Sequence, residues 1–291
     1  MNEYVLTLSC PDRVGIVHAV AAYLHRAGCN VLDSQQFGDR TVEGSSQFFM
    51  RVHVESLQPT PTTYRDLQEG FVPVAAEFAM EWELHDTAVQ PRALIMVSRA
   101  GHCLNDLLYR RAAESLRIDI PLVVGNHPDL APLAAAHGVP FEHVPADPAD
   151  PLSSQRAEGR LLDLIGELSI DFVVLARYMR ILSPELCAKL PGRIINIHHS
   201  FLPSFKGARP YHQAHAHGVK LIGATAHYVT ADLDEGPIIA QDVGVISHAD
   251  EPEELVRKGR DIERRVLAEG VKAHLEDRVL LNGARTVVFP G

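Results

Sequence analysis

The sequence predicts an α/β protein with two domains, a βαββαβ module followed by a mainly parallel, doubly wound sheet. Three observations lead to this prediction. The 291 residues suffice for two hydrophobic cores. Up to residue 85, β-rich and amphipathic runs follow one another in the order βαββαβ. Beyond residue 92, short apolar runs alternate with helical stretches, which is typical of right-handed crossovers and a parallel sheet covered on both faces.

The first domain is predicted to span residues 1–85. Its helices are indicated by apolar residues at helical spacing, and its strands by β-rich or alternating runs. Gly28 follows the first helix, where a residue that tolerates positive φ is favoured. The expected elements are a strand at 4–10, a helix at 14–27, strands at 30–37 and 48–54, a helix at 62–80 and a strand at 81–85. This order is that of a ferredoxin-like module.

Residues 86–92 contain Pro91 and show no periodicity, which indicates a linker, and the second domain is predicted to span 93–291. Strands are expected at 93–98, 121–125, 141–144, 172–176 and 194–198, with helices near 101–116, 129–137, 153–168 and 183–189 between them. Ligands of such sheets gather beyond the carboxyl ends of the strands. The fifth run ends at His198, so a site is expected there.

Composition excludes several classes of protein. The formal charge is −10 and no run of Lys and Arg supplies a basic face, so nucleic acid is not an expected partner. No stretch approaches ~18 apolar residues, and the N-terminal residues lack the pattern of an export signal, so neither a membrane span nor secretion is expected. The cysteines Cys10, Cys29, Cys103 and Cys187 are scattered, which favours reduced thiols in a cytoplasmic protein.

The densest cluster of polar residues lies at 196–212, and a second follows at 223–239. Asn196 and His198 are two apart on an expected strand, so their side chains point to the same face. The second cluster continues into a turn that contains Asp234. An amide and an imidazolium can stabilise a tetrahedral oxyanion, and a carboxylate can hold a histidine charged or orient water. These residue types therefore favour acyl transfer at a formamide.

The motifs N-I-H-x-S-x-L-P-x-F-x-G and G-A-T-x-H-x-V-x-x-x-L-D-x-G-P-I-I resemble those of the 10-formyltetrahydrofolate formyltransferase and hydrolase superfamily. The resemblance covers roughly residues 92–285. It implies that Asn196, His198 and Asp234 are the catalytic trio. It also implies a folate pocket lined by Tyr178, Met179, Arg180, Ile181, Leu182, Thr225, His227 and Thr230, partly through backbone groups, with the turn 230–234 closing on the pterin.

The acceptor of the formyl group distinguishes the members of this superfamily. Its glycinamide ribotide transferases have a Gly-Ser-Asn run after the first strand, which holds the phosphate of the acceptor. This chain has His102-Cys103-Leu104 there, which resembles the formyltetrahydrofolate deformylases and implies hydrolysis to formate and tetrahydrofolate. Such an activity would control one-carbon pools and supply formate for purine biosynthesis. Two alternatives stay open: a transferase with another acceptor, and a folate-binding regulatory protein.

Residues 8–36 resemble an ACT domain, the small amino-acid-sensing module of metabolic enzymes, and deformylases have such a module at this place. The resemblance implies that Asp12, Gly15 and Asn30 bind an effector, for which glycine and methionine are the candidates, between paired subunits of a homo-oligomer. The alternative is a module that only dimerises.

The expected reaction needs no cofactor and no metal. Asp234, assisted by His198 or His227, activates water, and Asn196 with protonated His198 holds the tetrahedral anion. The assignment of general base and general acid stays open. His212, His215 and His217 lack the companion ligands and spacing of a zinc site and are expected on a helix surface. His199 is expected to face away from His198.

Overall fold

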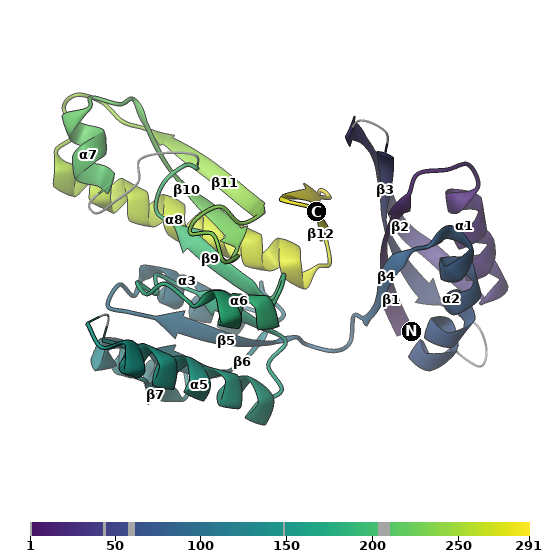
Figure 1. The fold of residues 1–291 in the computed structure, drawn as a ribbon, viewed down its shortest axis with the longest axis horizontal. Coiled ribbons are helices and arrows are strands. Elements are labelled where there is room, and N and C mark those ends of the chain that lie inside the picture. Colours follow the sequence, from purple (N-terminus) through teal and green to yellow (C-terminus); the bar gives the residue numbers. More distant parts are fainter. Residues whose placement is uncertain (1, 43–44, 58–61, 148, 203–209) are drawn as a thin grey trace. The chain divides into compact units, whose positions relative to one another are not determined.

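The computed structural model describes residues 2–42, 45–57, 62–147, 149–202 and 210–291. The chain divides into two units (Figure 1), one comprising Met1–Gln90, Asp277–Asn282 and Val287–Gly291, the other Pro91–Glu276 and Gly283–Thr286. The predicted α/β class is confirmed. The domain boundaries drawn at residues 85 and 92 stay a prediction, and the return of the last residues to the first unit was not among the sequence-based expectations.

The first unit contains a four-stranded sheet with the order β2-β3-β1-β4. The strands β1 and β3, β1 and β4, and β2 and β3 pair antiparallel. Figure 1 shows α1 and α2 together on one face of this sheet. The elements are β1 (Asn2–Pro11), α1 (Ile16–Arg26), β2 (Cys29–Val42), β3 (Ser45–Ser56), α2 (Tyr64–Phe78) and β4 (Glu81–Asp86). Their order is the βαββαβ order that the sequence predicts.

Hydrophobic periodicity explains how this unit buries its core. Alternate residues of β1, among them Leu6 and Leu8, face the helices. Ile16 and Val20 of α1 and Phe71 of α2 pack against them in one core. Gly28 has φ 73° directly after α1, as its place in the sequence predicts. Helix α2 begins with a capping box in which Thr63 and Asp66 satisfy each other's backbone N–H groups.

The last residues of the chain contribute a second, smaller core to the first unit. Leu280 and Phe289 pack with Phe49 of β3, so β3 buries side chains toward both faces of its sheet. Polar contacts add to this packing: Arg278 donates from Nη1 to the Phe289 carbonyl at 3.0 Å, and Asn282 donates to Asp39 at 2.7 Å. The strands concerned are β12 (Val279–Asn282) and β13 (Arg285–Val288).

The second unit is built on a seven-stranded sheet with the order β11-β10-β9-β8-β5-β6-β7. The five strands from β9 to β7 run parallel, and β10 and β11 are antiparallel additions beside β9. The elements are β5 (Arg92–Val97), α3 (His102–Ala112), β6 (Asp119–Gly125), η1 (Pro128–Leu130), α4 (Ala131–Ala136), β7 (Phe141–His143), α5 (Pro151–Glu167), β8 (Phe172–Leu175), α6 (Pro184–Lys189), β9 (Ile194–His198), α7 (Pro210–Ala216), β10 (Leu221–Tyr228), β11 (Ile238–Val245) and α8 (Pro252–Leu275).

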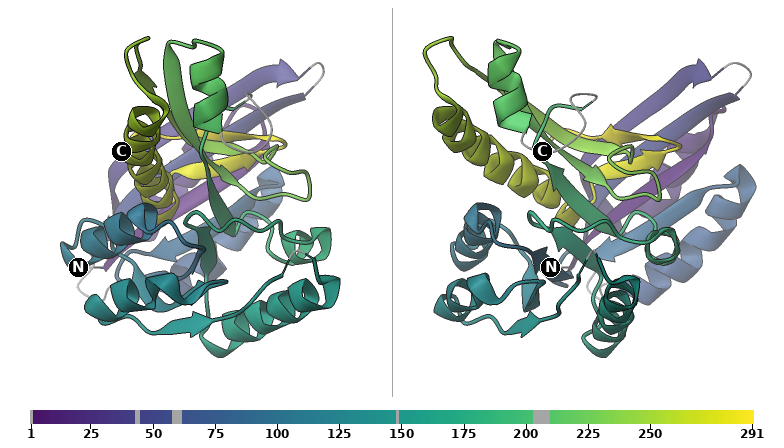
Figure 2. Two further views of the ribbon diagram at one scale, coloured as in Figure 1. Left: turned by 90° about the vertical axis from the view of Figure 1, so that its left-hand side faces the viewer. Right: turned by 60° about the vertical axis from the view of Figure 1, so that its left-hand side comes forward.

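Helices cover both faces of the parallel strands, so the central strands β5 and β8 are almost entirely apolar and buried. Leu94 and Val173 belong to a core that includes Leu161 of α5 and Leu186 of α6. Helix α8 runs along β9, β10 and β11 and contacts α3 (Figure 2). Because β5, β8 and β9 are parallel neighbours, the residues that follow them gather at one edge of the sheet.

Two further expectations concern the chain as a whole. Cys10, Cys29, Cys103 and Cys187 form no disulfide, as their scattered positions predict. Within the described ranges, no helix has the length and apolar character that crossing a membrane requires.

The contact between Asp277 and His85 generates a prediction about stability. Burial raises the pKa of Asp277 to about 6, although His85 Nδ1 lies 3.5 Å from its carboxylate. The folded protein therefore binds more protons than the unfolded chain between about pH 4 and 6, so this group lowers the stability as the pH rises through that window. Asp277→Asn should remove the effect and tolerate the left-handed backbone there, where φ is 53°.

The measurement is thermal unfolding of both proteins at pH 5 and pH 8. The variant should gain roughly a few degrees over the parent at pH 8 and less, or nothing, at pH 5. An equal difference at both pH values would contradict the assigned titration.

Candidate active site

The pairing of β9 with β10 brings the first predicted site residues together. In this antiparallel pair Asn196 lies opposite His227, and His198 lies opposite Thr225. Opposed side chains on such a pair share a face and lie close to one another. Asn196 and His198 therefore point to the same side of the sheet, as their spacing predicts, at the carboxyl end of β9.

Asp234 reaches this pair of strands from the turn between β10 and β11. Its Oδ1 lies 3.1 Å from His198 Nδ1 and 3.9 Å from His227 Nε2. The His198 contact holds the pKa of Asp234 below its usual value. Asp234 has φ 57° in the left-handed region, which is uncommon for a residue other than glycine and orients its side chain toward the two histidines.

A buried hydrogen-bonded chain determines the protonation of His227. Its Nδ1 lies 2.8 Å from the Tyr228 carbonyl, which can only accept, so Nδ1 carries the proton. Asn196 Nδ2 then donates to His227 Nε2 at 3.2 Å. Burial lowers the pKa of His227, which is 2% exposed. The neutral ring thus fixes the orientation of the Asn196 amide.

Thr225 and Thr230, both predicted for the folate pocket, act locally in different ways. Thr225 is fully buried, and its hydroxyl donates to the Ser200 carbonyl at 3.0 Å and accepts from the Leu202 N–H at 3.1 Å. It therefore ties the segment after β9 to β10. Thr230 donates to the Asp232 carbonyl at 3.2 Å within the turn. The motif residues Pro203 and Gly207 lie outside the described residues.

The segment 178–182, predicted to line the folate pocket, follows β8 at the same edge of the sheet. The Met179 N–H donates to Ser98 Oγ at 2.9 Å, and this hydroxyl lies 2.6 Å from the Asn126 side-chain amide. Arg180 donates from Nε to the Ala146 carbonyl at 2.9 Å, so its guanidinium binds backbone rather than a surface acid.

The side chains of this segment divide into two groups. Tyr178 and Leu182 are 9% and 8% exposed and belong to the core against α5 and α6. Burial raises the pKa of Tyr178 to about 12, so its hydroxyl stays protonated. Met179 and Ile181 are 52% and 73% exposed. Any ligand of this segment would therefore meet the side chains of Met179 and Ile181 and mainly the backbone of the rest.

The expectation that His199 faces away from His198 is wrong. The two rings are stacked with centroids 5.1 Å apart and an interplanar angle of 27°. The segment after β9 turns the chain out of its extended strand conformation, so the alternation of a strand no longer applies. Sequence reasoning also missed Arg177 and Glu263, which lie close to His199 and interact with its charge. No local motif marks these two residues.

One group of potential metal ligands occurs among the described residues, and it is a poor cation site. His102, Cys103 and Glu263 have ligand atoms within 4.8 Å of one another. His102 Nε2 already lies 2.7 Å from the Glu263 carboxylate, and Arg177 Nε is 3.4 Å from it. A metal ion would therefore compete with a guanidinium. Burial raises the pKa of Cys103 well above its usual value, which disfavours the thiolate.

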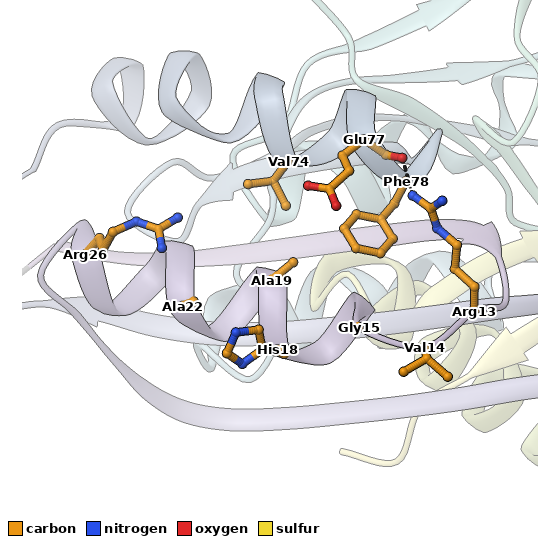
Figure 3. A pocket seen from close by; sticks show the side chains of 10 residues that line it. All are labelled: Arg13, Val14, Gly15, His18, Ala19, Ala22, Arg26, Val74, Glu77 and Phe78. Atoms are coloured by element: carbon orange, nitrogen blue, oxygen red, sulfur yellow. Dashed lines mark hydrogen bonds between the residues drawn. The ribbon is translucent and has the colours of Figure 1, made fainter.

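The predicted effector residues do not meet within one chain. Gly15 has φ 103° at the start of α1 and lines a cavity of about 440 Å³ with Arg13 and His18 (Figure 3). Asp12 accepts a hydrogen bond from Ser46 at 3.1 Å, and Asn30 donates to Glu55 at 2.9 Å. The 11 residues of α1, a length of ~16 Å, separate Gly15 from the segment of Asn30. A site with all three would need two copies.

The close approach of Gly236 to β10 yields a testable prediction. A Cβ at this position would lie 1.7 Å from the Tyr228 carbonyl oxygen, so Gly236→Ala must shift the turn that positions Asp234. The variant should fold but lose the His198–Asp234 contact, visible as a changed His198 Nδ1–H resonance in ¹H–¹⁵N NMR spectra. Gly166→Ala in α5 is the control, because nothing lies within 4 Å of its added Cβ. An unchanged resonance in the Gly236 variant would refute the steric argument.

Comparisons with known proteins agree with this architecture. Residues 91–271 match the formyl transferase family, and residues 4–69 match the ACT domain. A formyltetrahydrofolate deformylase from a Corynebacterium species is 46% identical over 287 residues, which cover 99% of this chain and 98% of that protein. The crystal structure of a glycinamide ribonucleotide transformylase from Symbiobacterium toebii matches with a TM-score of 0.64 and 30% identity, over 72% of this chain and 98% of that chain.

Deformylases and transformylases among the relatives differ in how much of this chain they match. The crystal structure of formyltetrahydrofolate deformylase from Burkholderia mallei has a TM-score of 0.92 and 50% identity, and the match covers 100% of both chains. The predicted resemblance is therefore confirmed over the full length, including the ACT module. The chain belongs to the formyltetrahydrofolate deformylase family.

Proposed function

We propose that this chain hydrolyses 10-formyltetrahydrofolate to formate and tetrahydrofolate, with Asn196, His198 and Asp234 acting on the formyl group. Membership in the deformylase family supports the reaction. The observation that supports the residue assignment is the convergence of an amide, an imidazole and a carboxylate at the carboxyl end of β9, with Asp234 3.1 Å from His198. Ligands of α/β sheets bind at this kind of edge.

His198 acts as the electrophilic group. Asp234 holds Nδ1, which leaves Nε2 to donate a hydrogen bond to the formyl oxygen. The contact with the carboxylate fixes the orientation of the ring. As the formyl carbon becomes tetrahedral, its oxygen gains negative charge, and the interaction with the imidazolium strengthens.

Asn196 supplies the second donor to this oxyanion. One hydrogen of its Nδ2 is engaged by His227 Nε2 at 3.2 Å, which leaves the other hydrogen for the substrate. A donor that is oriented before the reaction loses little energy in reorganisation when the charge develops. His227 thus positions Asn196 rather than taking part in the proton transfer.

Water attacks from the side of Asp234. The water oxygen forms a bond to the formyl carbon and gives one proton to the Asp234 carboxylate. The C–N10 bond then breaks, the electron pair goes to N10, and the proton is delivered to that nitrogen. The product formic acid loses the second proton of the water to solvent, and formate and tetrahydrofolate leave with the side chains in their starting protonation states.

The pterin enters a slot formed by residues 178–182 and the turn 230–234. Backbone groups of the first segment and the exposed side chains of Met179 and Ile181 form one wall. Met179 and Arg180 donate hydrogen bonds to Ser98 and Ala146, which follow β5 and β7, and these bonds keep this wall rigid. The hydrogen bond of Thr230 to the Asp232 carbonyl stabilises the opposite turn. The hydrogen bond of Thr225 to the Ser200 carbonyl stabilises the segment that follows β9.

The reaction needs no metal and no cofactor, because the imidazolium and the amide supply the electrophilic assistance. His212, His215 and His217 are exposed in or just after α7 and have no catalytic role. The four free thiols support a cytoplasmic location. In the cell, the formate released would feed purine biosynthesis, and the reaction would adjust the one-carbon pool.

A formyltransferase with another acceptor is the second candidate function, favoured by the likeness to the transformylase from Symbiobacterium toebii. The deciding experiment incubates purified protein with 10-formyltetrahydrofolate alone and follows formate and tetrahydrofolate. Stoichiometric release of both supports hydrolysis. A requirement for an added amine, such as glycinamide ribotide, would overturn it in favour of transfer.

The trio gives a direct prediction. Asn196→Ala, His198→Ala and Asp234→Asn should each lower kcat by about 10²-fold or more, because their interactions are strongest in the transition state. Binding of the folate, measured by calorimetry, should stay within a few-fold of the parent. The control variants are His215→Ala and Asp163→Asn, which change exposed residues of α7 and α5.

Near-normal turnover in Asp234→Asn would remove the carboxylate from the mechanism. Treatment with EDTA serves as a separate arm. Activity should be unchanged, and a loss that zinc alone restores would refute the metal-free reaction.

We also propose that the first unit binds glycine or methionine at the interface of a homo-oligomer, with Asp12 and Gly15 from one copy and Asn30 from the next. The N–H groups at the start of α1 suit an α-carboxylate. The separation of these residues along α1 supports a site that needs two copies. An effector must bind active and inactive states differently, so its binding and the activity must shift together.

Calorimetric titration of the whole chain with each amino acid tests this proposal. One of the two should bind, with an affinity that Asp12→Ala and Asn30→Ala lower by about tenfold or more, and it should change kcat or KM. The absence of binding by both amino acids would leave the module without the proposed effector.

A further inference from the structure

A second buried cluster lies beside the trio and is centred on Glu263 of α8. The carboxylate is 1% exposed. It accepts hydrogen bonds from the Tyr211 hydroxyl at 2.5 Å and meets His102 Nε2 at 2.7 Å, and Arg177 Nε lies 3.4 Å away. These partners come from α7, α3 and the turn after β8, so the cluster occupies the edge beyond the carboxyl ends of the parallel strands.

The backbone near this cluster makes room for its side chains. A Cβ at Gly259, one turn before Glu263 on α8, would lie 2.1 Å from the Tyr211 ring, so only glycine leaves room for that ring. Arg177 has φ 65°, an uncommon backbone for a residue with a side chain. A buried charged cluster rarely adds more stability than apolar residues of similar volume would. The arrangement therefore suggests a role beyond folding.

The charge of Glu263 is maintained in the interior. Burial acts to raise the pKa of Glu263, but the hydrogen bonds from His102 and Tyr211 and the Arg177 guanidinium hold it below its usual value. The carboxylate thus holds the side chains of His102, Tyr211 and Arg177 in place. Two of these, Tyr211 and Arg177, lie next to His199: the ring centroids of Tyr211 and His199 are 6.5 Å apart, and the charge of Arg177 acts on His199.

His199 is the link between this cluster and the trio, because its ring stacks on that of His198. Burial is the first cause that lowers the pKa of His199, to about 4, and the charges of Arg177 and His198 act in the same direction. Glu263 and Asp234 act in the opposite direction and are outweighed. His199 is therefore neutral across the physiological range of pH.

We propose that His199 is a positioning residue for His198, held between the Glu263 cluster and the trio by stacking on the His198 ring. The stack prevents rotation of the His198 ring, so that Nδ1 meets Asp234 while Nε2 faces the formyl group. This inference rests on the proposed function, in which His198 contacts the substrate.

The neutral state of His199 is part of this role. A neutral His199 ring stacks on His198 without adding a charge beside the trio. A protonated His199 would compete with His198 for Asp234, the carboxylate of the trio. Burial is the main cause of the lowered pKa of His199, and the charge of Arg177 adds to it.

The test compares His199→Ala with His199→Phe. The alanine variant loses the stack and should lower kcat by about tenfold or more, with KM within about twofold, because a small displacement of a catalytic group lowers turnover more than binding. The phenylalanine variant retains an uncharged ring and should recover most of kcat. His215→Ala, an exposed histidine on α7, should be unchanged.

The pH profile separates positioning from a structural role. In Arg177→Met, one positive charge that lowers the pKa of His199 is removed, so His199 should become charged at a higher pH than in the parent and kcat should fall more steeply on the acid side. The double variant Arg177→Met/His199→Phe has no ring to titrate and should lose this added pH dependence.

Unchanged kcat in folded His199→Ala, or an equal loss in His199→Phe, would overturn the positioning role. If Arg177→Met/His199→Phe retained the steeper fall of kcat at acid pH, the effect of Arg177 would not act through His199, and that part of the proposal would be overturned. His198→Ala is measured in parallel. If it stays active, the proposed function fails; if it is inactive while His199→Ala is normal, only this inference fails.

Discussion

The candidate site depends on the antiparallel addition of β10 to β9. Strand β9 supplies Asn196 and His198, and the added strand β10 supplies His227 and Thr225 directly opposite them. A shift of one residue in this pairing would turn the side chains of β10 to the other face. The Asn196 amide therefore meets the buried acceptor His227 Nε2 only in the observed register. Helix α8, which packs along both strands, stabilises this register by burial.

Backbone geometry, more than side-chain bonding, positions the carboxylate. Asp234 lies in the left-handed region, and Gly236 passes so close to the Tyr228 carbonyl that no other residue fits without a shift. The turn is thus determined by excluded volume on one side and by the attraction between Asp234 and His198 on the other. The strain at Asp234 is offset by this ion pair, which explains why a residue with a side chain occupies such a backbone conformation.

The sequence predicts local features of this protein well and long-range ones poorly. The strands and helices up to residue 198 follow from periodicity, whereas the long helix α8 was not among the predicted elements. The Asn196, His198 and Asp234 set is proposed from two motifs with a specific separation. Nothing local predicts that Glu263 meets His102, a residue 161 positions earlier, because α3 and α8 come together only through the sheet. For the same reason, the packing of Leu280 and Phe289 on β3 escapes a pattern analysis. His199 was misplaced because alternation ends where the strand ends.

The three histidines around Asp234 differ in their surroundings. Burial lowers the pKa of His227, and the Tyr228 carbonyl defines its tautomer. Burial and the charge of Arg177 lower the pKa of His199. Only His198 has a carboxylate within hydrogen-bond distance of a ring nitrogen and an aromatic ring against its face. Any second charge would weaken the hold of Asp234 on His198. In the proposed reaction the two buried clusters act in the same direction: one orients the groups that meet the oxyanion, and the other keeps competing charge away from them.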